Sequence, residues 1–344
     1  MSAGPDILLL VFLLLCAGLL LPPFFPAWRE WLRPTDRQVL RMAVGDDNQA
    51  SLLRLLRQQM ATLLGSGDPL AYESLEQALV RGVEPQAPGP QRPVFVSRTS
   101  HADHGIQSRW PVYAADDLQL RESSDLTDVL ADGHLVLGPH SRVRGWAHAE
   151  KTLLLGESSV VARDLSSEHG ISLAWACCFE RVQAPVIVFG QPGTRDHRSR
   201  PALPPHEPLP GARPWGRQGW RIEGDCVIQK GRHFTGSLVV TGVLSIGADA
   251  LVEGDVKAHK GVVIGERAHV TGGVFSDNGI RVFNEAVIGG PLVSESLLQL
   301  GAGVHLGSLR APTSVSANVI LADNGVLAHG SVCAAQAGLV WGTT

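Results

Sequence analysis

The sequence predicts an all-β fold, a β-solenoid with 18 residues per coil, and two observations carry this prediction. From Trp220 to Leu306, apolar residues recur as pairs, i and i+2, in every group of six residues. Side chains two positions apart in a strand point to the same side, so each pair marks a short strand and its inward face. Three such strands make one triangular coil, which buries its inward pairs by stacking on neighbouring coils. The whole chain is only 44% hydrophobic, so this pattern does not follow from composition.

The clearest block of the solenoid is placed at residues 219–344. Its inward pairs are Trp220/Ile222, Cys226/Ile228, Arg232/Phe234, Leu238/Val240, Leu244/Ile246, Ala250/Val252, Val256/Ala258, Val262/Ile264, Ala268/Val270, Val274/Ser276, Ile280/Val282, Ala286/Ile288, Leu292/Ser294, Leu298/Leu300 and Val304/Leu306. After Leu306 the register shifts by four residues around Pro312. It then resumes as Ile320/Ala322, Val326/Ala328, Val332/Ala334 and Gly338/Val340, so the solenoid is predicted to reach the C-terminus.

A further block of the same hexads, out of phase with the first, is predicted within residues 94–190. Its pairs are Leu135/Leu137, Ser141/Val143, Ala147/Ala149, Leu153/Leu155, Ser159/Val161, Leu165/Ser167, Ile171/Leu173 and Cys177/Phe179. Upstream of Leu135 the phase is looser, and we predict an atypical first coil that caps the stack. Residues 191–218 are rich in proline and arginine. Because proline cannot donate to a strand ladder, they are predicted to form an exposed inserted loop.

Residues 35–81 are predicted to form a helical spacer. Several leucines and Met60 give residues 52–64 a broad apolar face, with Arg54 and Arg57 opposite. Gly65 should end this helix, and a second helix is expected after Pro69. We interpret the pair as a surface hairpin, with docking on the solenoid or association between chains as alternatives. Residues 82–93 hold closely spaced prolines and are predicted to form a stiff linker.

Residues 1–34 are predicted to hold a transmembrane anchor. No charge occurs between Asp6 and Arg29, and this span would extend about 33 Å as a helix, enough to cross the hydrocarbon core. The residues expected to contact the lipid bilayer are Ile7, Leu10, Leu14, Leu21, Phe25 and Trp28. A cleaved signal peptide is the alternative, although no Lys or Arg precedes the apolar run.

Charge predicts the orientation of the span and excludes one class of partner. Arg29, Arg33, Arg37 and Arg41 follow the span, so the positive-inside rule places the solenoid in the cytoplasm. The five cysteines do not suggest a disulfide framework. A net charge of −4 argues against a nucleic-acid surface, and no nucleic-acid partner is expected.

The 13 histidines are candidates for a catalytic or metal site, because hexapeptide acyltransferases use a coil of the same period. His259 and His269 are expected on a solvated flank. His101 and His104 form H-x-x-H without the cysteine or carboxylate pattern that completes a metal site. No G-x-S-x-G, P-loop or dinucleotide motif occurs. The sequence therefore predicts no catalytic residue, no cofactor and no metal.

Residues 244–258 read Leu-Ser-Ile-Gly-Ala-Asp-Ala-Leu-Val-Glu-Gly-Asp-Val-Lys-Ala, and 262–272 read Val-Val-Ile-Gly-Glu-Arg-Ala-His-Val-Thr-Gly. This stretch resembles the bactofilins, polymer-forming bacterial cytoskeletal proteins, and the resemblance extends over residues 225–309. It implies a right-handed β-helix and nucleotide-free, end-to-end assembly on the inner face of the bacterial inner membrane. It also implies scaffolding of envelope-associated client proteins. The second block, the inserted loop and the transmembrane span depart from the family pattern.

We therefore predict a membrane-anchored, bactofilin-like scaffold that is not an enzyme. The alternatives are a hexapeptide-type acyltransferase or another solenoid enzyme, and a periplasmic binding module. A solenoid needs a cap at each end, and the few residues after Val340 are too short to cover a coil. Leu339, Val340 and Trp341 are accordingly the candidate edge for self-association, with a folded-back Trp341 plug as the alternative.

Overall fold

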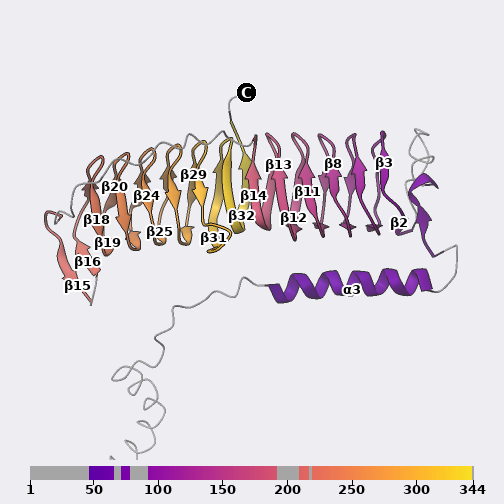
Figure 1. Cartoon of the computed structure of the whole chain (residues 1–344), viewed down its shortest axis with the longest axis horizontal. Coiled ribbons are helices and arrows are strands. Elements are labelled where there is room, and N and C mark those ends of the chain that lie inside the picture. Colours follow the sequence, from indigo (N-terminus) through magenta and orange to yellow (C-terminus); the bar gives the residue numbers. More distant parts are fainter. Residues whose placement is uncertain (1–45, 66–70, 78–91, 192–208, 217–218, 343–344) are drawn as a thin grey trace, which may run out of the picture. The chain divides into compact units, whose positions relative to one another are not determined.

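The computed structural model describes residues 46–65, 71–77, 92–191, 209–216 and 219–342. The chain divides into two compact units, residues 1–50 and residues 51–344. All the described strands belong to one continuous β-sheet of 32 strands, which winds into a solenoid within the second unit (Figure 1). The prediction of a β-solenoid is therefore confirmed.

Helix α3 spans Asp46–Gly65 and precedes the strands. The first block contains β1 (Glu73–Ser74), β2 (Val94–Val96), β3 (Ser100–Ala102), β4 (Val112–Ala114), β5 (Leu118–Leu120), β6 (Asp125–Leu126), β7 (Val129–Ala131), β8 (Leu135–Leu137), β9 (Arg142–Val143), β10 (Ala147–Ala149), β11 (Thr152–Leu155), β12 (Val160–Ser167), β13 (Gly170–Leu173) and β14 (Cys178–Phe189). The second block contains β15 (Arg213–Trp215), β16 (Gly219–Ile222), β17 (Cys226–Ile228), β18 (His233–Thr235), β19 (Ser237–Val240), β20 (Val243–Ile246), β21 (Leu251–Glu253), β22 (Val256–Ala258), β23 (Gly261–Ile264), β24 (His269–Val270), β25 (Val274–Ser276), β26 (Ile280–Val282), β27 (Val287–Ile288), β28 (Leu292–Ser294), β29 (Leu297–Leu300), β30 (His305–Leu306), β31 (Thr313–Ala322) and β32 (Val326–Val340).

Within each block the strands pair in parallel with those one coil later, apart from β15 and the last strands, β14 and β32. Leu244 of β20 lies beside Val262 of β23, which lies beside Ile280 of β26, so the coil contains 18 residues as predicted. The predicted inward positions are buried in both blocks, with the exceptions of Trp220 and Arg232, which are half-buried. The hexad register assigned from the sequence is therefore confirmed along the stack.

One corner of the coil bends through a residue in the left-handed region. Asp249, Arg267 and Glu285 occupy this corner in successive coils, with φ of 59°, 56° and 58°. Other corners are fastened by carboxylates: Oδ1 of Asp255 accepts a hydrogen bond from the Gly273 N–H at 2.7 Å, one coil later. The Asp255 carboxylate thus holds two successive coils together.

The predicted atypical cap at residues 94–134 is wrong, because these residues form regular coils. Val94 lies beside Val112 in the next coil, an interval of 18 residues, and Val112 lies beside Val129. The second interval is one residue shorter. One residue is missing at the corner between β6 and β7. The inward positions before this corner are therefore offset by one residue from the hexads that follow it.

The register shift after Leu306 is confirmed and has a local cause. Residues 308–311 form a small closed turn in which Ser308 and Ala311 bridge through two backbone hydrogen bonds. Leu298 consequently lies beside Ile320 instead of a residue 18 positions later. The four inserted residues bulge from a corner, and the inward pattern continues beyond them.

The two blocks meet through their last coils, which the sequence did not predict. β14 and β32 pair antiparallel, from Cys178 beside Leu339 to Phe189 beside Val326. Figure 1 shows these two strands side by side in the middle of the stack. The blocks therefore run in opposite directions, and we call the paired residues 176–189 and 326–341 the joint.

The inserted segment connects the joint to the far end of the second block. Of residues 191–218, the structure describes 191 and 209–216, and β15 within them pairs antiparallel with β16. The prediction of a loop is thus wrong for residues 213–215, which extend the sheet. The chain thus leaves the joint and begins the next block at its opposite end.

The structure does not support the transmembrane helix that was part of the predicted fold, and this part of the prediction is corrected. In the part of the chain that the structure describes, no helix is long and apolar enough to cross a membrane. The predicted anchor, residues 1–34, lies outside the described residues.

Helix α3 ends at Gly65, as predicted for the spacer, but Glu73–Ser74 forms a strand beside Val94–Phe95 where a second helix was expected. A helical turn begins only at Leu75.

Candidate functional site

The predicted assembly edge lies inside the joint. Val340 is fully buried, its N–H donates to the Cys177 carbonyl at 2.9 Å, and its carbonyl accepts from the Ala176 N–H at 2.9 Å. Leu339 lies beside Cys178, whereas Trp341 is 54% exposed. The first block thus covers the edge that we assigned to a second subunit, and Trp341 does not form the alternative plug. The anchor residues Ile7 to Trp28 lie outside the described residues.

Tight packing closes the joint. The rings of Phe179 and Phe189 lie 5.5 Å apart, and a Cβ added to Gly338 would meet the Phe179 ring at 2.3 Å. Burial raises the pKa of the Cys177 thiol to about 12, so this thiol stays protonated at neutral pH. The joint is therefore a dry, close-packed contact between the two last coils.

A cluster of polar side chains lies where α3 covers the β4–β7–β10–β12 flank. Leu130, His148 and Ser166 are outward-facing residues of β7, β10 and β12 and lie in register, yet all three are buried. On the helix, Met60 is buried among residues that include Tyr113 and Leu130. Docking of the spacer helix, one of the sequence alternatives, is therefore the arrangement observed for residues 51–65.

Ion pairs fasten the helix to this flank. Nη2 of Arg57 lies 3.1 Å from Oδ1 of Asp132 and also pairs with Glu150. The Tyr113 hydroxyl donates to Asp132, and burial together with this bond raises the Tyr113 pKa to about 12. The Arg57 hydrogen bond lowers the Glu150 pKa. Tyr113 lies in β4, while Asp132 and Glu150 directly follow β7 and β10 in the next two coils, so the solenoid repeat positions all three.

His148 is the most enclosed titratable group of the cluster. Its Nδ1 lies 2.8 Å from Oγ of Ser166, while Nε2 lies 3.7 Å from Oε1 of Glu150 and finds no hydrogen-bond partner among the described residues. Burial lowers the His148 pKa, so the ring is neutral in the docked state. Ser166, His148 and Glu150 are the residue types of a hydrolytic triad, but His148 and Ser166 are buried under α3, so this cluster binds the helix.

Acid should loosen α3. When the helix is undocked, His148 takes a proton as the pH falls through its ordinary value near 6.5, whereas the docked state resists that proton. Docking is thus fully favoured above this value and weakened below it, while Glu150, whose pKa is lowered, stays ionised at pH 5.5. We expect hydrogen exchange in residues 51–65, corrected for intrinsic rates, to be faster at pH 5.5 than at pH 7.5.

His148→Gln should remove most of this difference, and His104→Gln, at an exposed histidine, should retain it. Equal protection of α3 in the wild type at both pH values contradicts the assignment.

The histidines singled out by the sequence are engaged in cross-coil contacts or lie on the surface. His259 pairs with Asp277 of the next coil, and His104 lies 3.7 Å from Glu122. His269 is a half-buried, outward-facing residue of β24, and His101 is exposed on β3. Among the residues that the structure describes, no group of three or more His, Cys, Asp or Glu side chains could hold a metal ion.

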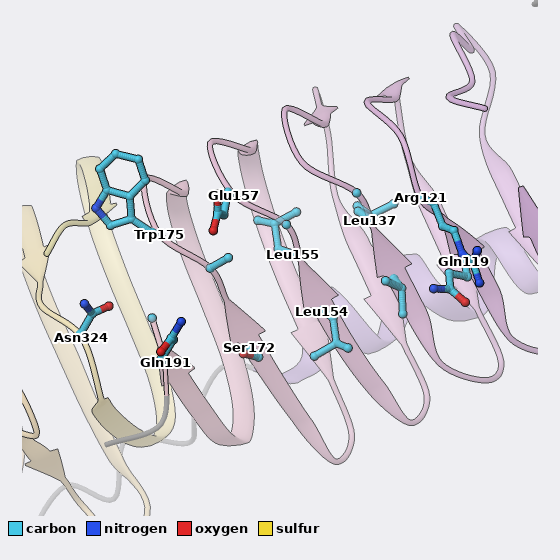
Figure 2. Close-up of a pocket in the computed structure, with 15 residues that line it drawn as sticks. Gln119, Arg121, Leu137, Leu154, Leu155, Glu157, Ser172, Trp175, Gln191 and Asn324 are labelled. Carbon is cyan, nitrogen blue, oxygen red and sulfur yellow. The ribbon is translucent and has the colours of Figure 1, made fainter. Parts of the chain in front are cut away.

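A groove of about 900 Å³ lies on another flank of the first block, beside the joint (Figure 2). Its floor is a register of outward side chains, Gln119, Val136, Leu154 and Ser172, from β5, β8, β11 and β13. Figure 2 shows Trp175, Gln191 and Asn324 near the joint, and Gln119 and Arg121 at the other end. The hexad pattern does not predict this groove, because it distinguishes outward positions from inward ones but not from one another.

No protein-family model, no curated protein and no solved structure matches this chain.

Proposed function

We propose that this chain is a non-enzymatic scaffold protein, the role that its resemblance to the bactofilins implies. The observation that carries the proposal is the joint, which makes one continuous sheet from two blocks. A continuous stack of parallel coils is a stiff element, since each coil is hydrogen-bonded to both neighbours. Such an element holds partners at fixed separations along its flanks.

The use of charged side chains supports a structural role. Nε of Arg267 donates to Asp249 of the preceding coil at 2.8 Å, and Nζ of Lys257 lies 3.1 Å from Asp277 of the next coil. Ion pairs of this kind are distributed along the stack and neutralise its charges. They do not concentrate charge at a single site where a reaction could take place.

The joint changes the mode of assembly that the resemblance implies. It makes within one chain an end-to-end contact of the kind that we expected between two chains. The C-terminal coils of both blocks are used in this contact, so each outer end of the stack is the N-terminal coil of its block. We therefore propose that the single chain, closed at its joint, is the working unit of the scaffold.

A scaffold should function without the histidines that face carboxylates. A chain carrying His104→Gln, His148→Gln, His233→Gln and His259→Gln should restore the growth or shape of a strain deleted for this protein. The physical reason is that His104, His233 and His259 contribute contacts between coils, His148 contributes to the surface that binds α3, and none supplies chemistry. Circular dichroism establishes that the variant is folded. Loss of complementation by a folded variant would indicate an enzyme and contradict the proposal.

A further inference from the structure

We propose that the groove beside the joint binds an extended, uncharged polysaccharide, an activity beyond the scaffold role. Its volume of about 900 Å³ lies within the range typical of ligand sites, roughly 300–1,000 Å³. It follows the direction in which the coils stack, so its contacts repeat at each coil. Its length thus suits a chain-like ligand with a short repeat.

Small residues occupy one corner of the coils that form the groove. Gly138, Gly156, Ala174 and Gly190 hold this corner in successive coils, and all four line the groove. A Cβ on Gly138 would lie 2.3 Å from the Arg121 carbonyl oxygen, so close stacking of the coils excludes a side chain there. From Gly138 to Gly190 this corner therefore carries no side chain larger than a methyl group, which leaves room above the row of outward side chains.

Two exposed apolar side chains give the groove its binding surface. Leu154 is 44% exposed on the floor, and Trp175 is 41% exposed at the corner that follows β13. Nε1–H of Trp175 donates to the Gly342 carbonyl at 2.8 Å, which fixes the indole across the joint. A partly exposed aromatic ring held in one position is a platform for the apolar face of a sugar ring, and it loses little side-chain entropy on binding.

The polar groups of the groove select for an uncharged ligand. Gln119, Ser172, Gln191 and Asn324 supply amide and hydroxyl groups, which both donate and accept hydrogen bonds and so match sugar hydroxyls. The one cationic side chain of the described lining, Arg121, donates to Asp103 at 3.3 Å, and Glu157 adds a negative charge. A phosphate-rich or strongly acidic polymer would lack the uncompensated cations that it needs.

Calorimetric titration of the full-length chain with a panel of neutral oligosaccharides, such as cellohexaose and chitohexaose, tests the proposal. We expect at least one to bind and an acidic oligogalacturonate of the same length to bind more weakly. Trp175→Ala should weaken the binding at least tenfold, because it removes the stacking platform. Trp110→Ala, at a Trp that is 45% exposed outside the groove, should leave it unchanged.

A second pair of variants tests the groove without altering the joint. Leu154→Arg places a long side chain in the middle of the floor and should abolish binding. Val263→Arg, at an outward position of β23 in the other block, is the matched control and should bind like the wild type. Absence of binding to every neutral glycan, equal binding by Trp175→Ala, or preferential binding of an extended peptide would overturn the proposal. These binding results are independent of the complementation experiment with the four-histidine variant, which tests the scaffold role.

Discussion

Replacing Ile264 with Asp should unfold the coils around it. Ile264 is fully buried in β23, between Ile246 and Val282 of the adjoining coils. A carboxylate there has no partner and no water, and we expect the free energy of unfolding to fall by about 4 kcal/mol or more. Because each coil is stabilised by its neighbours, the loss should spread to adjacent coils. Urea denaturation followed by circular dichroism measures the change.

The matched control is Glu266→Gln, two residues further along the chain. The Glu266 side chain is 49% exposed, and its ion pair is with the adjacent Arg267. Exposed pairs of this kind contribute little, so we expect a change below about 0.5 kcal/mol. Equal effects of the two substitutions would show that the inward register is misassigned.

Replacing Val340 with Asp should open the joint and uncouple the two blocks. Val340 is fully buried against the backbone of Cys177, whereas the next residue, Trp341, is 54% exposed. A buried charge at the joint costs several kcal/mol, which corresponds to a fall of roughly 10 °C in Tm for a chain of this size. Differential scanning calorimetry should show this fall, with separate transitions for the two blocks.

Trp341→Asp is the control for the joint, and we expect it to shift Tm by less than about 2 °C because the side chain is already in water. If the substitutions at 340 and 341 had equally small effects, the edge would be open as the sequence suggested. The contact between blocks would then not stabilise the fold.

The sequence alone determined the β-solenoid fold and, for nearly every residue in the stack, whether its side chain points into the core or outward. The pairs from Leu238/Val240 to Val304/Leu306 are buried as assigned, because a short strand in a coil has only two faces and a fixed period. The same local rule predicted the four-residue shift near Pro312. It failed at residues 94–134, where one deleted corner residue moved the phase while the coils stayed regular.

The tertiary structure alone decided how the blocks are arranged and which outward residues matter. Nothing in the periodicity shows that β14 pairs with β32. The hexad pattern predicts only which residues of one coil lie beside those of the next coil, and these two strands are more than a hundred residues apart. The burial of His148 likewise depends on a helix from another part of the chain. The groove arises from outward residues of separate coils, so its polarity and depth exist only once the coils are stacked.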